Sequence, residues 1–260
     1  MPLSAEKIDE VAAALHSARE NGEPLRVPAV PLELNDSYAI QDAVARRHGG
    51  IDGWKVGAKN PTAIPTCAPL LRGTITHSHN VAVKGAVGVE VEFAYRIGRD
   101  FDDTYALTDE DILGSVPSAH IAVELCASRL ANTEQVPLLV LADNQMHERL
   151  VLGPPFSASA PLDPTSVVAR LTIDAETAIE TTGGHPVGTP HRLLCWAVRN
   201  CVARFGGVKA GQIITTGSWT GMHWITPPSH IKAELVGFPS LAFRITRVSE
   251  GAGVRTDSSG

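Results

Sequence analysis

The sequence alternates strictly over Val87-Gly88-Val89-Glu90-Val91-Glu92-Phe93-Ala94-Tyr95-Arg96-Ile97. Every odd-numbered residue in this stretch is apolar, whereas the even-numbered residues are small or charged. A period of two is typical of a β-strand with one face in the core. Shorter alternating runs, separated by loops rich in glycine and proline, occupy most of the chain after Gly53. We therefore predict an α+β fold with a mixed, mainly antiparallel β core.

The first 50 residues have a helical period instead. Ser4 can cap a helix whose apolar face recurs at positions 8, 11, 12 and 15, and a second helix is expected after Asp36-Ser37. A third helix is expected inside the core, with Thr189 as its cap and Pro190 at its first position. We expect a helical N-terminal segment over 1–50, a catalytic core over 51–248 and a disordered tail over 249–260.

The composition and charge argue against several classes of protein. Of 260 residues, 43% are hydrophobic, which fits a globular chain. The formal charge is −6, and no run of lysine and arginine could follow a nucleic acid backbone. No stretch approaches the roughly 18 apolar residues of a membrane span, and the acidic start does not fit a signal peptide. We expect a cytoplasmic protein without nucleic acid or membrane partners, whose four cysteines are reduced and packed.

Three glutamates are candidate metal ligands. Glu90 and Glu92 lie two residues apart and so share one face of the predicted strand. Glu124 lies in a second alternating run, 119–126, among apolar residues. Like charges side by side are unfavourable unless a cation or a proton lies between them, and Mg²⁺ and Mn²⁺ prefer such oxygen ligands. The alternative is an ordinary half-buried strand whose polar face contacts water.

Two further segments are candidates for binding an anion. Lys55 is a single cation in the apolar strand 53–57, bracketed by glycines. It is either a surface lysine or a group that holds an anionic substrate and moves a proton. The loop 215–221 is small and rich in hydroxyl groups, and its backbone N–H groups could hold a carboxylate, although plain turns have the same composition.

These segments together resemble the 2-keto-4-pentenoate hydratase / 4-oxalocrotonate decarboxylase family of the fumarylacetoacetate hydrolase superfamily. The resemblance covers roughly residues 35–247, and the joint occurrence of its motifs is specific. The matching motifs, in chain order, are Gly53-Trp54-Lys55-Val56-Gly57, Val89-Glu90-Val91-Glu92-Phe93, Ile97-Gly98-Arg99-Asp100, Val123-Glu124, Ser128-Arg129, Ala142-Asp143-Asn144, Val151-Leu152-Gly153, Gly184-His185-Pro186, Leu193 with Trp196, Lys209-Ala210-Gly211 and Thr216-Gly217-Ser218.

The resemblance implies a mixed β fold, a homo-oligomer and a divalent metal, Mg²⁺ or Mn²⁺. It implies that Glu90, Glu92 and Glu124 hold the metal and that a small 2-oxo acid binds there. It also implies that Lys55 acts at the reacting centre. Gly217, Ser218 and Asp143 are the residues expected to bind the substrate.

The expected reaction is hydration of a 2-hydroxy-2,4-dienoate to a 4-hydroxy-2-oxo acid, in the degradation of aromatic compounds. A decarboxylase of the same family, a C–C bond hydrolase and a non-enzymatic binding protein are the alternatives. One departure bears on the choice. Many hydratases of the family have an acidic residue in a Pro-Asp-aromatic-Gly segment, where this chain reads Pro69-Leu70-Leu71-Arg72-Gly73. Another group must take over any proton transfer by that acid, or the reaction differs.

Overall fold

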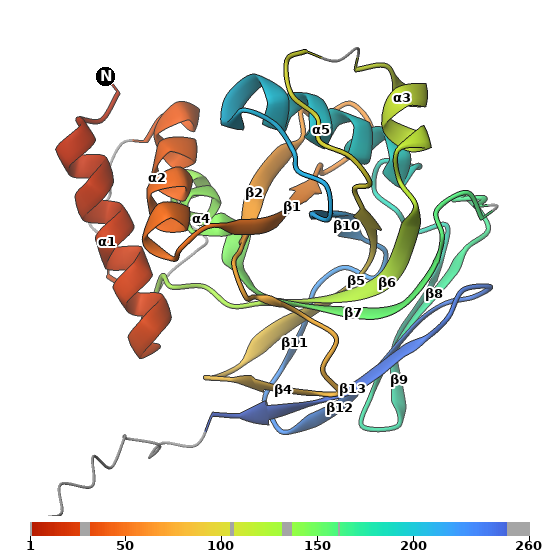
Figure 1. Ribbon diagram of the computed structural model, residues 1–260. Helices are drawn as coiled ribbons and strands as arrows, with labels where there is room; N and C mark the ends of the chain where they lie inside the picture. Colours follow the sequence, from red (N-terminus) through yellow and green to blue (C-terminus); the bar gives the residue numbers. More distant parts are fainter. Residues whose placement is uncertain (1, 27–31, 105–106, 132–136, 161, 249–260) are drawn as a thin grey trace, which may run out of the picture.

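The computed structural model has two β-sheets, with a pair of helices packed against one end (Figure 1). It describes residues 2–26, 32–104, 107–131, 137–160 and 162–248. The predicted disordered tail lies outside these residues. Both sheets combine parallel and antiparallel pairs, with antiparallel pairs in the majority, which confirms the predicted fold class.

The larger sheet has eight strands and curls strongly (Figure 1). Its strand order is β2-β1-β10-β5-β6-β7-β3, and β11 pairs with β5 outside this path. Its strands are β1 (Ile51–Gly57), β2 (Thr66–Leu71), β3 (Ile75–Thr76), β5 (Val87–Arg96), β6 (Ser118–Cys126), β7 (His147–Ser157), β10 (Ile213–Ser218) and β11 (His223–Ile225).

The smaller sheet covers the outer face of β5 and β6. Its order is β4-β13-β12-β8-β9, and Val91 and Phe93 of β5 share one apolar core with Ile231 and Phe243 of this sheet. The predicted apolar face of the 87–97 stretch is thus buried between the sheets. The strands are β4 (Asn80–Val83), β8 (Val168–Ile173), β9 (Glu176–Thr182), β12 (Ser229–Leu235) and β13 (Leu241–Arg247).

The helices cover the remaining faces. Ser4 caps α1 as predicted, by accepting a hydrogen bond from the backbone N–H of Lys7. The predicted start of α2 is wrong: the helix begins at Leu34, and Asp36 closes a capping box with Glu33 from its third position. The helices are α1 (Ala5–Asn21), α2 (Leu34–Arg47), α3 (Asp109–Gly114), α4 (Pro137–Ala142) and α5 (Pro190–Phe205), with a short turn η1 (Asn144–Met146).

The N-terminal helices join the core through a second apolar cluster. Leu15 of α1 and Ile40 of α2 pack with Leu71 of β2 and Leu139 of α4. Helix α5 contacts β1 and β10 instead, where it closes the open side of the curled sheet. No helix among the described residues is long and apolar enough to cross a membrane.

Candidate active site

The register of two central strands places two carboxylates directly opposite each other. Glu90 of β5 pairs with Glu124 of β6, and Gly88 pairs with Cys126. One ligand atom from each of Glu90, Glu124 and Cys126 lies within 4.8 Å of the others. Like charges at opposite positions of an antiparallel pair destabilise a sheet. The arrangement therefore needs a compensating cation or proton.

Lys55 supplies one compensating charge. Its Nζ donates to Glu124 Oε1 at 2.7 Å and to the backbone carbonyl of Gln145 at 3.1 Å. Burial disfavours the ammonium, but Glu124 outweighs this effect, and the pKa of Lys55 is raised. The sequence left open whether Lys55 is a surface lysine. It is 9% exposed, and its charge faces the glutamates.

Glu124 is the most enclosed of the three glutamates. Its Oε1 also meets His147 Nδ1 at 3.0 Å, while the other ring nitrogen of His147 lies 2.8 Å from Thr74 Oγ1. Burial opposes ionisation of Glu124, yet Lys55 and His147 outweigh it, so the pKa of Glu124 is lowered. Its Oε2 is buried without a hydrogen-bond partner among the described residues. An ionised oxygen in that state is costly unless something else binds it.

Glu92 lies beside this pair under a glycine loop. Its Oε2 accepts a hydrogen bond of 3.1 Å from the backbone N–H of Gly217, and Ser218 is its register partner on β10. Burial, followed by the charges of Glu124 and Glu90, raises the pKa of Glu92 to about 8. Burial also raises the pKa of Glu90. Without a cation, Glu92 therefore holds a proton at neutral pH.

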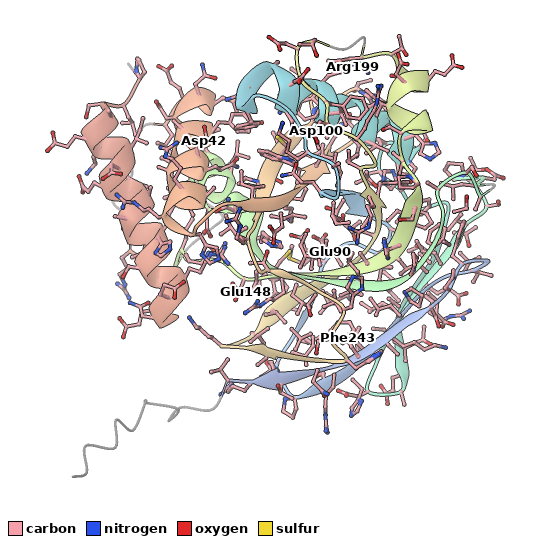
Figure 2. The ribbon with its side chains drawn as sticks, in the orientation of Figure 1. Asp42, Glu90, Asp100, Glu148, Arg199 and Phe243 are labelled. Atoms are coloured by element: carbon pink, nitrogen blue, oxygen red, sulfur yellow. The ribbon has the colours of Figure 1, made fainter. Side chains whose placement is uncertain are left out.

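A cavity of about 400 Å³ opens onto this face. Figure 2 places Glu90 inside the curve of the large sheet, away from the apolar layer that contains Phe243. Carboxylates, a lysine and backbone N–H groups thus meet in one recess. Of the predicted site residues, those lining it are Lys55, Glu90, Glu92, Gly217 and Ser218, and Gln145, Lys59 and Gly184 line it as well.

The turn η1 presents its backbone to the cavity in an unusual conformation. Asn144, Gln145 and Met146 have φ angles of 51°, 50° and 62°. Non-glycine residues rarely adopt this left-handed region, and such strain gathers at functional sites. The turn directs the carbonyl of Gln145 at Lys55, while the Gln145 amide donates to Thr66 Oγ1 at 2.6 Å. No sequence pattern indicated this turn.

Asp143 lies elsewhere, in a buried ion pair. Its Oδ1 accepts from Arg129 Nε at 2.5 Å, and its Oδ2 accepts from the backbone N–H of Arg129 at 2.9 Å. Its side chain is 2% exposed and does not line the cavity next to Lys55. Asp143 thus contacts Arg129 directly before the strained turn, and substrate binding by Asp143 stays a prediction.

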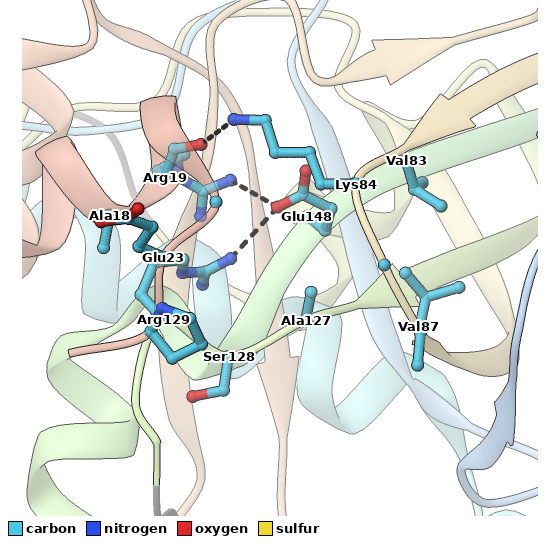
Figure 3. Close-up of a pocket in the computed structure, with 14 residues that line it drawn as sticks. Ala18, Arg19, Glu23, Val83, Lys84, Val87, Ala127, Ser128, Arg129 and Glu148 are labelled. Carbon is cyan, nitrogen blue, oxygen red and sulfur yellow. Dashed lines mark hydrogen bonds and ion pairs between the residues drawn. The ribbon is translucent and has the colours of Figure 1, made fainter. Parts of the chain in front are cut away.

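Arg129 belongs to a network that reaches the N-terminal helix. Glu148 accepts from both Arg129 and Arg19 of α1 at 3.2 Å, at the edge of a second cavity (Figure 3). Both arginines also donate to the backbone carbonyl of His147, at 3.0 and 2.6 Å. Helix α1 therefore supports the histidine that holds Glu124.

Two residues that contact the metal-candidate carboxylates were not predicted from sequence as site residues. Cys126 Sγ lies 3.6 Å from Glu90 Oε2, and His147 contacts Glu124. Cys126 had a usable signal, since it lies two residues after Glu124 on the same strand face. His147 had none, because its neighbours do not alternate and its contact depends on the turn before it. All four cysteines are free and buried.

The comparisons with known proteins agree with this geometry. The model of the fumarylacetoacetate (FAA) hydrolase C-terminal domain matches residues 56–246. The chain belongs to the fumarylacetoacetate hydrolase family. It is 24% identical, over 92% of its length and 95% of the relative's, to a 2-keto-4-pentenoate hydratase of Paraburkholderia xenovorans.

Solved structures show the same fold. A 4-oxalocrotonate decarboxylase from Pseudomonas putida G7, complexed with magnesium and adipate, superposes with a TM-score of 0.80 at 20% identity, covering 95% of this chain and 99% of that one. The same decarboxylase, complexed with calcium and acetate, gives a TM-score of 0.78. The family model and the curated relatives thus confirm the suspected family, and the solved structures confirm the mixed β architecture.

The buried position of Asp143 yields a prediction about stability. Asp143→Asn leaves the Arg129 guanidinium without its main counter-charge, so the free energy of unfolding should fall by about 3–5 kcal/mol. Urea denaturation at pH 7 measures this loss. The control is Asp109→Asn, which breaks an exposed pair with Arg199 and should cost less than about 1 kcal/mol. Unchanged stability with a raised Michaelis constant would instead support direct substrate binding by Asp143.

Proposed function

We propose that the chain is a metal-dependent hydratase that adds water to a 2-hydroxy-2,4-dienoate and gives a 4-hydroxy-2-oxo acid. One observation carries the proposal. The buried Lys55–Glu124 ion pair lies behind a cavity that is lined by Lys55, Glu90 and Glu92 and is large enough for a small acid. The hydratases among the relatives support the choice of reaction.

The carboxylates fit a hard divalent cation. Glu124 Oε2 is buried without a partner among the described residues, and Glu90 lies opposite it in the register. Burial raises the pKa of the nearby Cys126 thiol well above 9. The oxygen ligands that the three carboxylates offer are those that Mg²⁺ and Mn²⁺ prefer. We propose that Glu90, Glu92 and Glu124 hold this cation.

Bound there, the cation would act as a Lewis acid for the substrate's 2-oxygen. The chain's own groups do the remaining work. The Lys55 ammonium adds positive charge at the same oxygen or moves a proton, and Glu124 and Gln145 hold it in place. The loop at Gly217-Ser218 adjoins the carboxylates, where it can bind the substrate.

The chemistry needs an electron sink at the 2-oxygen. Protonation at the terminal carbon of the dienol, with loss of the 2-hydroxyl proton, gives a conjugated 2-oxo-enoate. Water then adds to the activated double bond. Both steps pass through negative charge on the 2-oxygen, so groups that stabilise this charge stabilise the transition states.

Decarboxylation is the second candidate, and one observation favours it. Leu70 and Leu71 are buried where many hydratases have an acidic segment, so this segment offers no carboxylate for proton transfer. Loss of CO₂ uses the same electron sink and requires no activated water.

A C–C bond hydrolase needs a base that can activate water, typically a His–Glu pair. The sequence showed no such motif, yet the structure brings His147 and Glu124 together. His147 is fully buried, both its nitrogens are engaged, and burial lowers its pKa to about 4. His147 does not line the cavity, so it is a poor base toward water there. Its hydrogen bond holds Glu124 in place.

Self-association and a cytoplasmic location also belong to the proposal. The resemblance implies a homo-oligomer, and Trp224 of β11 is 58% exposed, an apolar side chain that contact between copies would cover.

The reaction itself is the first test. Purified protein with Mg²⁺ should remove the ultraviolet absorbance of 2-hydroxypenta-2,4-dienoate, and a chelator should abolish this turnover. Product identification then separates the candidates, since hydration adds water, whereas a dicarboxylate substrate that loses CO₂ identifies a decarboxylase. If correctly folded, metal-loaded protein shows neither hydration nor decarboxylation, the proposal is contradicted.

Removal of one carboxylate should remove the metal. Glu90→Gln and Glu124→Gln should each abolish measurable Mg²⁺ or Mn²⁺ binding by calorimetry. Without metal, Glu90→Gln should also be slightly more stable than the parent, because it relieves repulsion by Glu124. Glu180→Gln, on the exposed strand β9, is the matched control and should bind normally. Unchanged affinity in both active-site variants would reject the metal site.

Lys55→Met tests the role of the buried lysine. If its charge acts mainly in the transition state, kcat should fall by about a hundredfold or more, with a smaller effect on KM. Lys55→Arg should rescue only in part, because a guanidinium is bulkier and holds its proton. Lys232→Met removes an exposed strand lysine and should leave kcat unchanged. A rise in KM alone would make Lys55 an anchor for the carboxylate.

A further inference from the structure

A second cluster of metal-binding side chains lies outside the cavity, where the two N-terminal helices meet. It consists of His16 and Glu20 of α1 and His48 at the C-terminal end of α2. One ligand atom from each lies within 4.8 Å of the others. The imidazoles of His16 and His48 are 5.8 Å apart between ring centres, and His48 Nδ1 lies 4.0 Å from Glu20 Oε1.

The backbone holds these three residues in place. His16 and Glu20 are four residues apart, so they project from one face of α1 on successive turns. The helices that carry them pack through Leu15 and Val44 in one apolar cluster. In a tetrahedral zinc site, ligand atoms lie about 3.4 Å apart, as bond lengths of about 2.0–2.2 Å require. The Glu20 side chain, 62% exposed, has the freedom to close the remaining distance.

The chemistry of the cluster differs from that of the cavity. Burial, followed by the positive charge of Arg19, lowers the pKa of His48. Two imidazoles and one carboxylate suit Zn²⁺, Ni²⁺ or Cu²⁺, whereas Mg²⁺ prefers oxygen ligands alone.

The nearby charges permit a cation. Arg19 precedes Glu20 on α1, but its guanidinium pairs with Glu148 and the carbonyl of His147, on the side of the core. The Lys84 ammonium donates to the backbone carbonyls of Arg19 and Glu20. The other neighbouring guanidinium, that of Arg72, lies 3.8 Å from Asp52.

We propose that His16, Glu20 and His48 form a binding site for a zinc-type transition metal, with water completing the coordination. The metal links the last turns of α1 to the end of α2. Arg19 lies on that same part of α1 and supports His147. The site is thus a structural clamp, separate from the carboxylates of the cavity.

The test titrates Zn²⁺ into tag-free protein. Glu90→Gln serves as the parent, so that zinc in the cavity does not interfere. We expect one equivalent of Zn²⁺ to bind, and the thermal midpoint to rise by about 5 °C or more at a concentration about 100 times Kd. Adding His16→Ala or Glu20→Ala should weaken binding by about a hundredfold or more, since loss of a supporting contact alone costs up to that much. Both remove half-buried or exposed side chains, so the fold should persist.

His79→Ala is the matched control, an exposed histidine on the smaller sheet's side, and should change neither readout. Co²⁺ gives a second readout, because a visible absorption band of the low-coordinate ion should appear in the parent and vanish in both variants. Zinc isotherms and midpoint shifts that match the parent in His16→Ala and Glu20→Ala would overturn the proposal. Magnesium-dependent turnover in His16→Ala, with the cavity intact, reports separately on the proposed reaction.

Discussion

Glu90 and Glu124 lie directly opposite each other on neighbouring strands, and the rest of the site compensates for the closeness of these two carboxylates. A sheet places opposite side chains about 4.5–5.5 Å apart, so neither carboxylate can move away without breaking the ladder. The chain compensates with the ammonium of Lys55 and the imidazole of His147 on one oxygen of Glu124. It leaves the other oxygen unpartnered among the described residues. Burial, with the charge of Glu124 as a smaller cause, raises the pKa values of Glu90 and Glu92.

The supports of this pair extend far from the cavity. The backbone of His147 is held by two buried arginines, one of them on the N-terminal helix α1. Asp143, one residue before the strained turn, fixes the second arginine. Hydrogen bonds therefore connect the N-terminal helical segment to the site. The sequence alone predicts only a helical segment packed on a larger core. Removing one partner of such a buried ion pair is strongly destabilising, because the other charge is left buried without compensation.

Sequence reasoning succeeded where periodicity carries information. Strict alternation located β5, its buried face and the shared face of Glu90 and Glu92, and capping residues located α1 and α5. It failed where a contact depends on register or on an unusual backbone. No local sequence pattern indicates that residue 90 pairs with residue 124. No pattern indicates either that residues 144–146 adopt left-handed φ angles without a glycine. The Asp36 signal was real but lay at the third position of α2, because Glu33 caps that helix.

In the left-handed turn, the backbone and the side chain of Gln145 make different contacts. The carbonyl of Gln145, a group that every amino acid has, accepts a hydrogen bond from Lys55. The side-chain amide of Gln145, a residue that lines the cavity, donates to Thr66 Oγ1 instead. Exchange of that side chain can therefore reshape the cavity while the lysine keeps its acceptor, provided that the new residue tolerates a φ near 50°. Asparagine and glycine do so at the lowest cost. Position 145 is thus a place where substrate preference can change during evolution without disturbing the charges on which the reaction depends.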